Sequence, residues 1–504
     1  RETKLYASTS SVFSKPLGYF SSDVSYFKQK YVDFMANYNS PIAQDINLTA
    51  TLGTSYEEYD NKGQGFGGHL FLIPNKFIFP NTNQLQSGGS QSSTRKSNFA
   101  VFASAELAWR NALYLTLTGR TDKPSQLVGS VDPWIFYPSI GLSAVVTDLI
   151  SEDLRAKLRP TLSYLKVRTS YTEVGSPVSR SGMTPGTITT PLIGGSLKST
   201  DIYPFTDYKA ERTKSYEVGL TARFWNKLSL DLTLYKSNTY NQTFIGDLPE
   251  SSGYKAVYLQ AGNVENRGIE MALSYNDNFG GVQWNSSLVY AKNINEIKEM
   301  VKDYYHPMSP KPINIPEVSK DKGRVLLKVG GSINDIYARK VLAKDNQGFV
   351  NVSPSGGIGL ETVDPIYLGK TTPDFTMGWN NSFTYKNFGL SFLLNARFGG
   401  VVTSSTQALL DRFGVSKASA DARDAGGVML PNQGLYDAKK YYMLTATGEN
   451  DLAGYYTYSA TNVRLQELTL SYKFDSRWFK NIIKDLTLSF VATNPWMIYC
   501  KAPF

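Results

Sequence analysis

The residue types that carry acid–base and nucleophilic chemistry are few in this sequence. Only two histidines occur, His69 and His306, and neither has a nucleophile motif beside it, so a Ser-His-Asp arrangement is poorly supported. The segments Glu57-Glu58 and Glu449-Asn450-Asp451 place carboxylates close together, but general acid–base catalysis needs a shielded cleft. Their position in polar stretches predicts solvated loop carboxylates instead. We therefore expect no catalytic residue and no enzyme.

Metal and cofactor chemistry also finds little support. The single cysteine, Cys500, excludes an intramolecular disulfide and a zinc–thiolate cluster, because both need several thiols. The segment Lys344 to Gly348 resembles part of a calcium loop, but it lacks the alternating Asp ligands and the distal bidentate Glu. It predicts an Asn/Gly turn. We expect no metal site and no cofactor.

Aromatic and arginine side chains in the long polar stretches are the candidates for binding. Flat aromatic rings with polar neighbours suit sugars, and they equally suit peptide side chains or another protein. Packing of a loop against itself would also account for them. Arginines could bind carboxylates in a bidentate manner, which would favour a peptide. The candidates are the aromatics Trp134, Tyr137, Tyr203, Phe205, Tyr455 and Tyr456, and the arginines Arg339 and Arg412.

Composition excludes disorder and disfavours nucleic acid. With 41% hydrophobic and 13% aromatic residues, the chain of 504 residues has too much apolar surface to stay unfolded. The formal charge is +9, yet the Lys and Arg residues are scattered singly, whereas phosphate tracking needs them clustered. Solvated loops or contact with anionic lipid head groups explain them better. No run of about 18 apolar residues exists, but a transmembrane β-barrel needs only strands of about 10 alternating residues.

Alternation of apolar and polar residues predicts many β-strands. It is clearest at residues 228–235, where leucines at every second position face one side and Ser229, Asp231 and Thr233 face the other. About fifteen strands can be placed in this way. Helical periodicity is scarce. Other clear segments are 46–52, 113–120, 268–275, 388–398 and 485–493.

The connections between these strands alternate between short and long. Short turns are expected at Arg110-Asn111, Trp225 to Lys227, Asn276 to Gly281 and Lys386-Asn387. Aromatic residues flank these turns, as they do at a membrane interface. Long connections rich in Gly, Ser and Pro are expected at roughly 59–97, 121–136, 173–212, 243–266, 296–373 and 399–460. A meander with such unequal ends predicts a large antiparallel barrel, closed because an open sheet edge in lipid leaves backbone groups unpaired.

Six segments add a family resemblance to this pattern. They are 157–177, 211–242, 263–275 (NVENRGIEMALSY), 364–400, 462–474 and the final NPWMIYCKAPF. In order and spacing, from about residue 100 to the end, they resemble the SusC/RagA family of TonB-dependent outer-membrane transporters. Each also has a conformational role: Gly268 is expected to permit a close backbone approach, and Gly399-Gly400 to end a strand with positive φ.

The resemblance implies a complete protein with a barrel of about 22 strands, of which this chain, residues 1–504, supplies roughly 15 as part of one domain. It implies long extracellular loops, short periplasmic turns, a plug and a TonB-contacting segment before Arg1, and closing strands after Phe504. The implied function is TonB-dependent import of oligosaccharides or peptides across a Gram-negative outer membrane. The implied partners are a SusD-like lid lipoprotein, the TonB complex, outer-membrane lipid and lipopolysaccharide, and a second barrel–lid pair in a dimer.

Other functions fit the same strands. A passive porin-like channel or a metal-chelate receptor would also be a closed barrel, distinguished by what precedes Arg1 and by the lack of a lid. A secreted β-rich adhesin or carbohydrate-binding protein would stay soluble without detergent, because its apolar faces would pack on each other. An outer-membrane hydrolase would need a catalytic set that the sequence does not offer.

Overall fold

One large antiparallel sheet dominates the computed structural model. The structure describes residues 1–8, 15–83, 88–130, 132–177, 202–203, 209–247, 256–304, 311–320, 325–446, 452–480 and 482–503. Fifteen strands follow one another in a single path, as the alternation predicted. They are β1 (Glu2–Leu5), β2 (Tyr19–Ala43), β3 (Ile46–His69), β4 (Gly88–Trp109), β5 (Leu113–Pro124), β6 (Ile135–Val145), β7 (Leu162–Ser176), β9 (Glu211–Phe224), β10 (Leu228–Asp247), β11 (Ala256–Phe279), β12 (Val282–Glu299), β19 (Phe375–Tyr385), β20 (Phe388–Phe398), β25 (Asn462–Phe474) and β26 (Leu486–Cys500).

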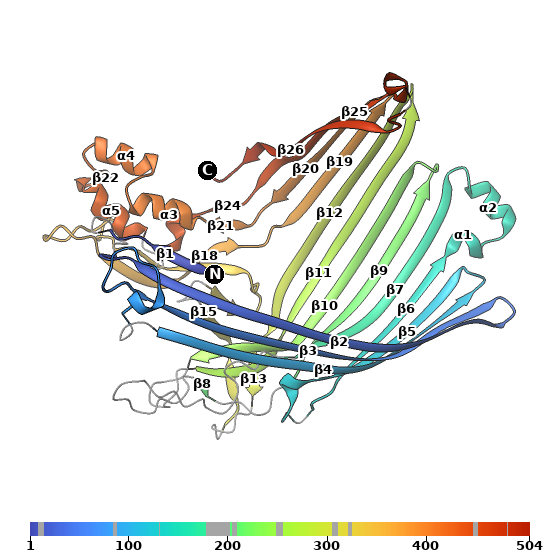
Figure 1. Cartoon of the computed structure of the whole chain (residues 1–504), viewed down its shortest axis with the longest axis horizontal. Coiled ribbons are helices and arrows are strands. Elements are labelled where there is room, and N and C mark those ends of the chain that lie inside the picture. Colours follow the sequence, from blue (N-terminus) through green and yellow to red (C-terminus); the bar gives the residue numbers. More distant parts are fainter. Residues whose placement is uncertain are drawn as a thin grey trace.

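The sheet is a curved wall with two different ends. Short turns and the helices α1 (Val146–Leu149) and α2 (Glu152–Leu158) lie at one end, and the small sheets and the helices α3 (Ser405–Arg412), α4 (Lys417–Asp424) and α5 (Ala438–Thr445) lie at the other (Figure 1). Neighbours in the sheet are neighbours in sequence except where β7 pairs with β9, β12 with β19 and β20 with β25. The strand β8 (Ile202–Tyr203) pairs in parallel with β11 beside this path. The meander and its unequal ends are therefore confirmed.

The short turns are built from residues that tolerate positive φ. Arg110 and Asn111 both have φ 51°, Trp225 has 51° and Asn226 has 56°, which is the left-handed conformation that two-residue hairpins require. Gly399 and Gly400, at φ 74° and 76°, end β20 as expected. Two helices at the short-turn end were not expected: α1 (Val146–Leu149) and α2 (Glu152–Leu158) connect β6 to β7.

Two of the expected long connections are wrong, because strands occupy most of them. Residues 59–97 contain the ends of β3 and β4, which pair from Ile46↔Trp109 to Gly67↔Gly88. Residues 243–266 contain the ends of β10 and β11, paired as far as Asp247↔Ala256. Backbone hydrogen bonding continues past the apolar stripe, where the side chains are polar and their alternation disappears. The change from apolar to polar residues in the sequence therefore shows where the apolar stripe ends, but it does not show where the strand ends.

Two of the remaining long connections, 296–373 and 399–460, contain small elements among their described residues. Between β12 and β19 lie β13 (Val301–Tyr304), β14 (Ile313–Ile315), β15 (Glu317–Lys320), β16 (Val325–Lys328), β17 (Asp335–Leu342) and β18 (Leu360–Lys370). Between β20 and β25 lie β21 (Val401–Thr403), α3 (Ser405–Arg412), α4 (Lys417–Asp424), β22 (Val428–Leu430), β23 (Gly434–Tyr436), α5 (Ala438–Thr445), η6 (Ala453–Tyr456) and β24 (Thr457–Ser459). A buried apolar cluster fixes the first group to the wall; it comprises Val264, Ile297, Met300, Val301, Val318 and Leu327. Among the described residues, short 3-10 helices also occur at η1 (Phe79–Asn81), η2 (Ser125–Leu127) and η7 (Ser476–Phe479).

Both edges of the sheet lack a full partner within the described residues. β1 covers β2 only at Tyr19 to Ser22, so most of the outer edge of β2 is unpaired. β26 pairs with β25 on one side, and its residues are almost all exposed. In the part of the chain that the structure describes, no helix has the length and apolar character needed to cross a membrane.

Candidate functional site

The polar face of the sheet carries a network of charged and hydroxyl side chains. Arg168 on β7 donates from both terminal guanidinium nitrogens to the Asp231 carboxylate on β10, at 2.8 and 3.1 Å. The same guanidinium donates to Thr221 at 2.9 Å and Thr233 at 2.7 Å. Gly219 makes room for it, because a Cβ at that position would lie 2.4 Å from Arg168 Nε. A charged side chain is thus held flat against the polar face by partners on two other strands.

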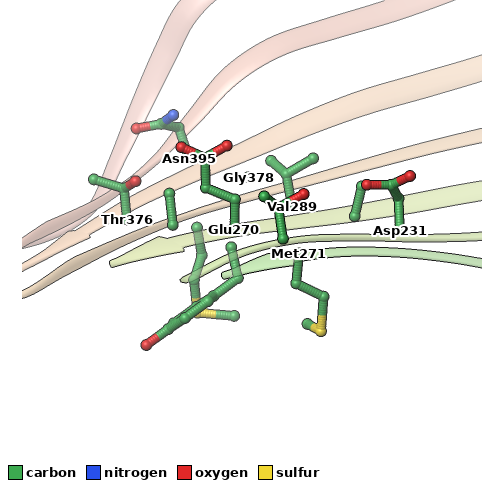
Figure 2. A pocket seen from close by; sticks show the side chains of 12 residues that line it. Asp231, Glu270, Met271, Val289, Thr376, Gly378 and Asn395 are labelled. Carbon is green, nitrogen blue, oxygen red and sulfur yellow. The ribbon is translucent and has the colours of Figure 1, made fainter. Parts of the chain in front are cut away.

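A depression of about 330 Å³ continues this face across β10, β11, β12, β19 and β20. Figure 2 shows Asp231, Glu270 and Asn395 on one side of the strands, with Met271 pointing to the other side. Gly378 and Ala291 also line the depression, and their small size leaves space between the polar groups. The wall therefore offers carboxylates, an amide and hydroxyls on one face, and an apolar surface on the opposite face.

A second polar group lies nearer the long connections. The buried carboxylate of Asp122 accepts from Arg120 Nε at 2.7 Å, from Asn98 at 3.2 Å and from the Tyr137 hydroxyl at 3.3 Å. Register places Arg120 opposite Tyr137 on β6, so the candidate Tyr137 lies on the same polar face as Arg168. Its hydroxyl is engaged with Asp122, while its ring lines the wall.

Helices α3, α4 and α5 enclose a pocket of about 400 Å³ in the connection between β20 and β25. Each helix begins after a residue whose side chain accepts a backbone N–H: Ser404 from Gln407, Ser416 from Ser419 and Asp437 from Lys440. These helices span eight residues each, too few for a clear helical repeat, which explains why periodicity missed them. The pocket is lined by the cations Arg412, Arg423 and Lys439, the carboxylate of Asp411, and the apolar side chains of Phe413 and Met443, with Tyr442.

Asp411 connects two of the binding candidates. Its buried carboxylate accepts from the Tyr456 hydroxyl at 3.0 Å and from Gln407 at 2.8 Å, and Arg412 follows it at the end of α3. Burial raises the pKa of Tyr456, and the nearby Asp411 charge raises it further. Tyr456 thus stays a neutral donor that satisfies Asp411. Arg412, Arg423 and Lys439 give the pocket its positive charge.

The other candidates are spread over the molecule. Trp134 packs edge-on against Phe99, and Lys123 lies 5.2 Å from its ring, which places Trp134 on the apolar face of the sheet and away from the polar wall. Arg339 lies in β17, where its Nε is buried and has no hydrogen-bond partner among the described residues. Tyr455 is exposed beside the buried Tyr456. Tyr203 lies in β8, and Phe205 lies outside the described residues.

The structure also shows where the acidic segments and the segment that resembles a calcium loop lie. The expectation that Glu57 and Glu58 are loop carboxylates is wrong: both lie in β3 on opposite faces, and Glu58 is buried against Lys30 and Arg95. The turn predicted at Lys344 to Gly348 is confirmed, because Asp345 accepts the N–H groups of Gln347 and Phe349. His306 and residues 449–451 lie outside the described part of the chain. Within that part, no three His, Cys, Asp or Glu side chains group as metal ligands would.

Sequence inspection missed Arg168, Asp231 and Asp122. Asp231 was visible as a charge on the polar side of the leucine stripe, but its partner lies 63 residues away. Only the strand register brings Arg168 on β7 and Asp231 on β10 across the same strand, β9. The sequence did show a charged residue on the polar side of a strand. It did not show which strand carries the oppositely charged partner.

Known proteins with related sequences are outer-membrane receptors. The chain is 24% identical over 458 residues to TonB-dependent receptor P3 of Formosa agariphila, covering 84% of this chain and 43% of that protein. It is 25% identical over 311 residues to TonB-dependent receptor SusC of Bacteroides thetaiotaomicron, covering 58% of this chain and 29% of SusC. The chain therefore spans less than half the length of these relatives.

Solved structures agree on the fold. The open-open state of the RagAB peptide importer superposes with a TM-score of 0.74 at 17% identity, covering 99% of this chain and 54% of that one. The closed-closed state gives a TM-score of 0.73 at 16% identity. The model of the family described as TonB dependent receptor-like, beta-barrel matches residues 2–494. The resemblance to SusC-like transporters is thereby confirmed, and the chain belongs to the TonB-dependent receptor β-barrel family of the bacterial outer membrane.

Proposed function

We propose that this chain forms most of the barrel wall of a SusC-like importer, which takes up oligosaccharides or peptides with energy supplied through TonB. The single observation that carries the proposal is the two-faced wall: apolar toward lipid, and lined on the other side by Arg168, Asp231 and Glu270. A polar interior suits passage of a polar cargo through the membrane. Many large apolar side chains of the sheet are exposed. A soluble adhesin or binding module would not expose an apolar face of this extent to water.

We propose that further strands pair with β2 and β26 to close the barrel. Backbone groups at an open edge in hydrocarbon each cost several kcal/mol, so both edges need partners. A plug inside the barrel and a TonB-contacting segment belong to the same proposal. The polar groups on the wall would then face the plug or the cargo.

A SusD-like surface lipoprotein is the proposed lid over the long-connection end. RagAB, one of the structural neighbours, is a peptide importer, and the helices and small sheets between β12 and β25 lie at that end (Figure 1). The pocket beneath α3, α4 and α5 contributes three cations and one carboxylate that is already satisfied by Tyr456 and Gln407. This charge favours a cargo that bears a carboxylate, whether a peptide or an acidic sugar.

Native mass spectrometry on the protein extracted from its own outer membrane in mild detergent tests the assembly. We expect a complex of a barrel polypeptide longer than this chain with a lipid-modified second subunit. A species that needs no detergent would overturn the membrane barrel, and a barrel without a lid would favour a porin or a chelate receptor.

Uptake by whole cells tests the energy coupling. We expect accumulation of cargo to stop when the proton-motive force is collapsed by an uncoupler or when TonB is deleted. Uptake that continues at the same rate under both conditions would defeat the importer and support a passive channel. Deleting only the lid should lower uptake without abolishing insertion of the barrel.

A further inference from the structure

A band of charged side chains lies on the apolar face of the sheet, just beyond the apolar stripe at the long-connection end. We call it the basic belt. Register places its members on the same face as the stripe, because they continue its every-second-residue pattern on each strand. Its cations are Lys28, Lys30, Lys62, Arg95, Lys123, Arg212, Lys214, Lys236, Arg267, Lys292 and Lys298, and its acids are Glu58, Asp60, Glu173, Glu265 and Glu296.

Aromatic side chains mark the level at which the belt begins. Tyr56 and Phe99 sit opposite each other on β3 and β4, with Trp134 packed against Phe99. Tyr171 and Tyr216 form the same layer on β7 and β9, with ring centroids 4.8 Å apart. Aromatic rings of this kind settle at the interface of a membrane. The belt starts two residues further along these strands, at the level of the lipid head groups.

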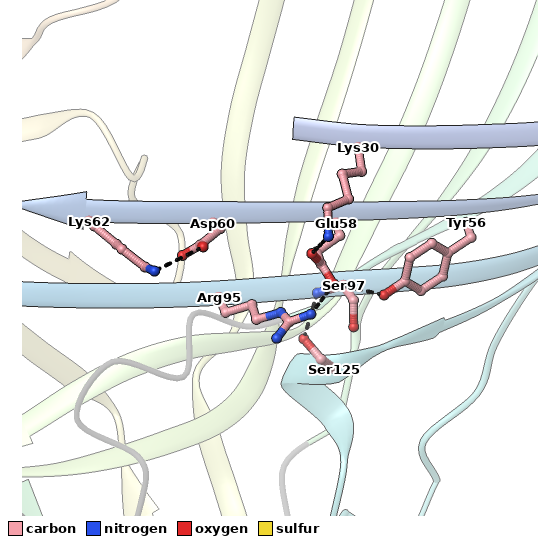
Figure 3. Close-up of polar contacts among 8 residues, drawn as sticks. All are labelled: Lys30, Tyr56, Glu58, Asp60, Lys62, Arg95, Ser97 and Ser125. Carbon is pink, nitrogen blue, oxygen red and sulfur yellow. Dashed lines mark hydrogen bonds and ion pairs between the residues drawn. The ribbon is translucent and has the colours of Figure 1, made fainter. Parts of the chain in front are cut away.

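The first cluster of the belt is centred on Glu58. Its carboxylate pairs with Lys30 at 2.8 Å and with Arg95, and it accepts from the Tyr56 hydroxyl at 3.0 Å (Figure 3). The Glu58 side chain is 7% exposed, whereas Lys30 is 50% and Arg95 67% exposed. The acid is covered by its partners, so the cluster presents two cations and a net charge of +1.

The same arrangement recurs on the next strands. Glu173 accepts from the Tyr171 hydroxyl and lies 3.5 Å from Lys214 and 3.8 Å from Arg212. Glu265 on β11 lies between Lys236 at 2.9 Å and Lys298 at 3.7 Å. Glu265 is 7% exposed and Lys236 56% exposed, so the acid is again covered and a cation is presented.

The carboxylates of Glu58 and Glu173 each lie between two cations, whereas in the third cluster Glu265 and Glu296 lie among three cations, Lys236, Lys298 and Arg267. Each cluster therefore keeps one more cation than it has acids. Isolated surface ion pairs contribute little to stability, so stability alone does not explain three clusters of this composition at one level. Lys28 and Lys292 lie in the belt without an ion pair among the described residues. Fixed pairs of ammonium and guanidinium groups at head-group level match phosphate, which accepts several charge-assisted hydrogen bonds.

We propose that the basic belt binds the phosphate groups of the glycolipid, lipopolysaccharide, in the outer leaflet around the barrel. The belt lies outside the wall and away from the cargo path, so it would hold lipid in place beside the transporter. This inference rests on the outer-membrane family and on the lipid-facing position of the belt. It does not depend on the identity of the cargo, on the lid or on coupling to TonB.

Retention of lipopolysaccharide by the complete transporter tests the proposal. The protein is stripped of lipid in detergent and titrated with lipopolysaccharide, and bound glycolipid is counted by native mass spectrometry. The variant Lys30→Gln/Lys214→Gln/Lys236→Gln should lose about fivefold in affinity per cation, or about 100-fold in total, if each cation contributes about 1 kcal/mol at an anionic surface. The matched control, Lys227→Gln/Lys386→Gln/Lys473→Gln, removes the same charge at the short-turn end and should bind normally.

Two further arms protect the test from misfolded variants. Lys30→Arg/Lys214→Arg/Lys236→Arg keeps the charge of the belt and should retain the affinity for lipopolysaccharide. Dephosphorylated glycolipid should bind the unaltered protein far more weakly than the phosphorylated form. Equal affinity for the two glycolipids, a loss in the arginine variant as large as in the glutamine variant, or equal losses in the belt and control variants would each overturn the proposal.

Discussion

Arg412 is the sequence candidate with the best-defined surroundings. It lines the pocket of about 400 Å³ with Arg423 and Lys439, and the neighbouring Asp411 is already engaged by Tyr456 and Gln407. Arg412→Gln should weaken binding of a carboxylate-bearing cargo by about tenfold, the loss expected for one charge-assisted hydrogen bond. Calorimetry with an acidic cargo and with its amidated or esterified form would measure this. Lys417→Gln is the control, because it removes an exposed cation paired with Asp421 on the same connection. It should leave the affinity for the acidic cargo unchanged.

Tyr456 has a structural role that is separable from binding. Tyr456→Phe removes the hydroxyl that donates to the buried Asp411 carboxylate, and leaving that group short of a donor costs about 1–3 kcal/mol. We expect faster hydrogen exchange in α3 and α5 and unchanged exchange in β10 and β11. Exchange rates in the two helices equal to those of the parent protein would contradict the role of this bond.

At the scale of elements, Gly268 allows β11 to approach the strands on either side of it closely. A Cβ at this position would lie 2.4 Å from the Lys292 carbonyl oxygen and 2.5 Å from the Tyr235 ring, as the predicted close approach requires. Gly268→Ala should therefore lower the free energy of unfolding by about 1–3 kcal/mol through overpacking. Thermal unfolding in detergent measures the change.

Gly89 provides the matched comparison for Gly268. It also lies in a strand, β4, and a Cβ there would meet no atom within 4 Å. Gly89→Ala should leave the midpoint of thermal unfolding unchanged or raise it slightly, since alanine restricts the unfolded chain. Equal effects of the two substitutions would show that the close approach at Gly268 carries no cost.

For the whole molecule, the two sheet edges decide whether the wall is closed. Within the described residues, β2 beyond Ser22 and β26 each have one unpaired edge. In the complete protein we expect slow amide hydrogen exchange along both strands, as slow as in the central strands β10 and β11. Rapid exchange along either strand in a folded, detergent-solubilised sample would contradict a closed barrel.

The sequence alone determined the strands, the short turns and the unequal ends, because these depend on neighbouring residues. The leucines of 228–234 alternate within one strand, and Trp225-Asn226 adopt positive φ within one turn. It could not determine where strands end beyond the apolar stripe, as residues 59–97 show, since backbone pairing there is insensitive to polarity. Short helices such as α3 escaped it because eight residues carry too little periodicity.

Only the tertiary structure decided which charged groups meet. Arg168 and Asp231 are 63 residues apart, and Lys30 and Arg95 approach Glu58 across separations of 28 and 37 residues. Register across three or more strands sets these contacts, and a shift by one residue would move every side chain to the opposite face. Packing against Phe99 places Trp134 on the lipid side, whereas strand register places Tyr137 on the polar wall, although the two are only three residues apart.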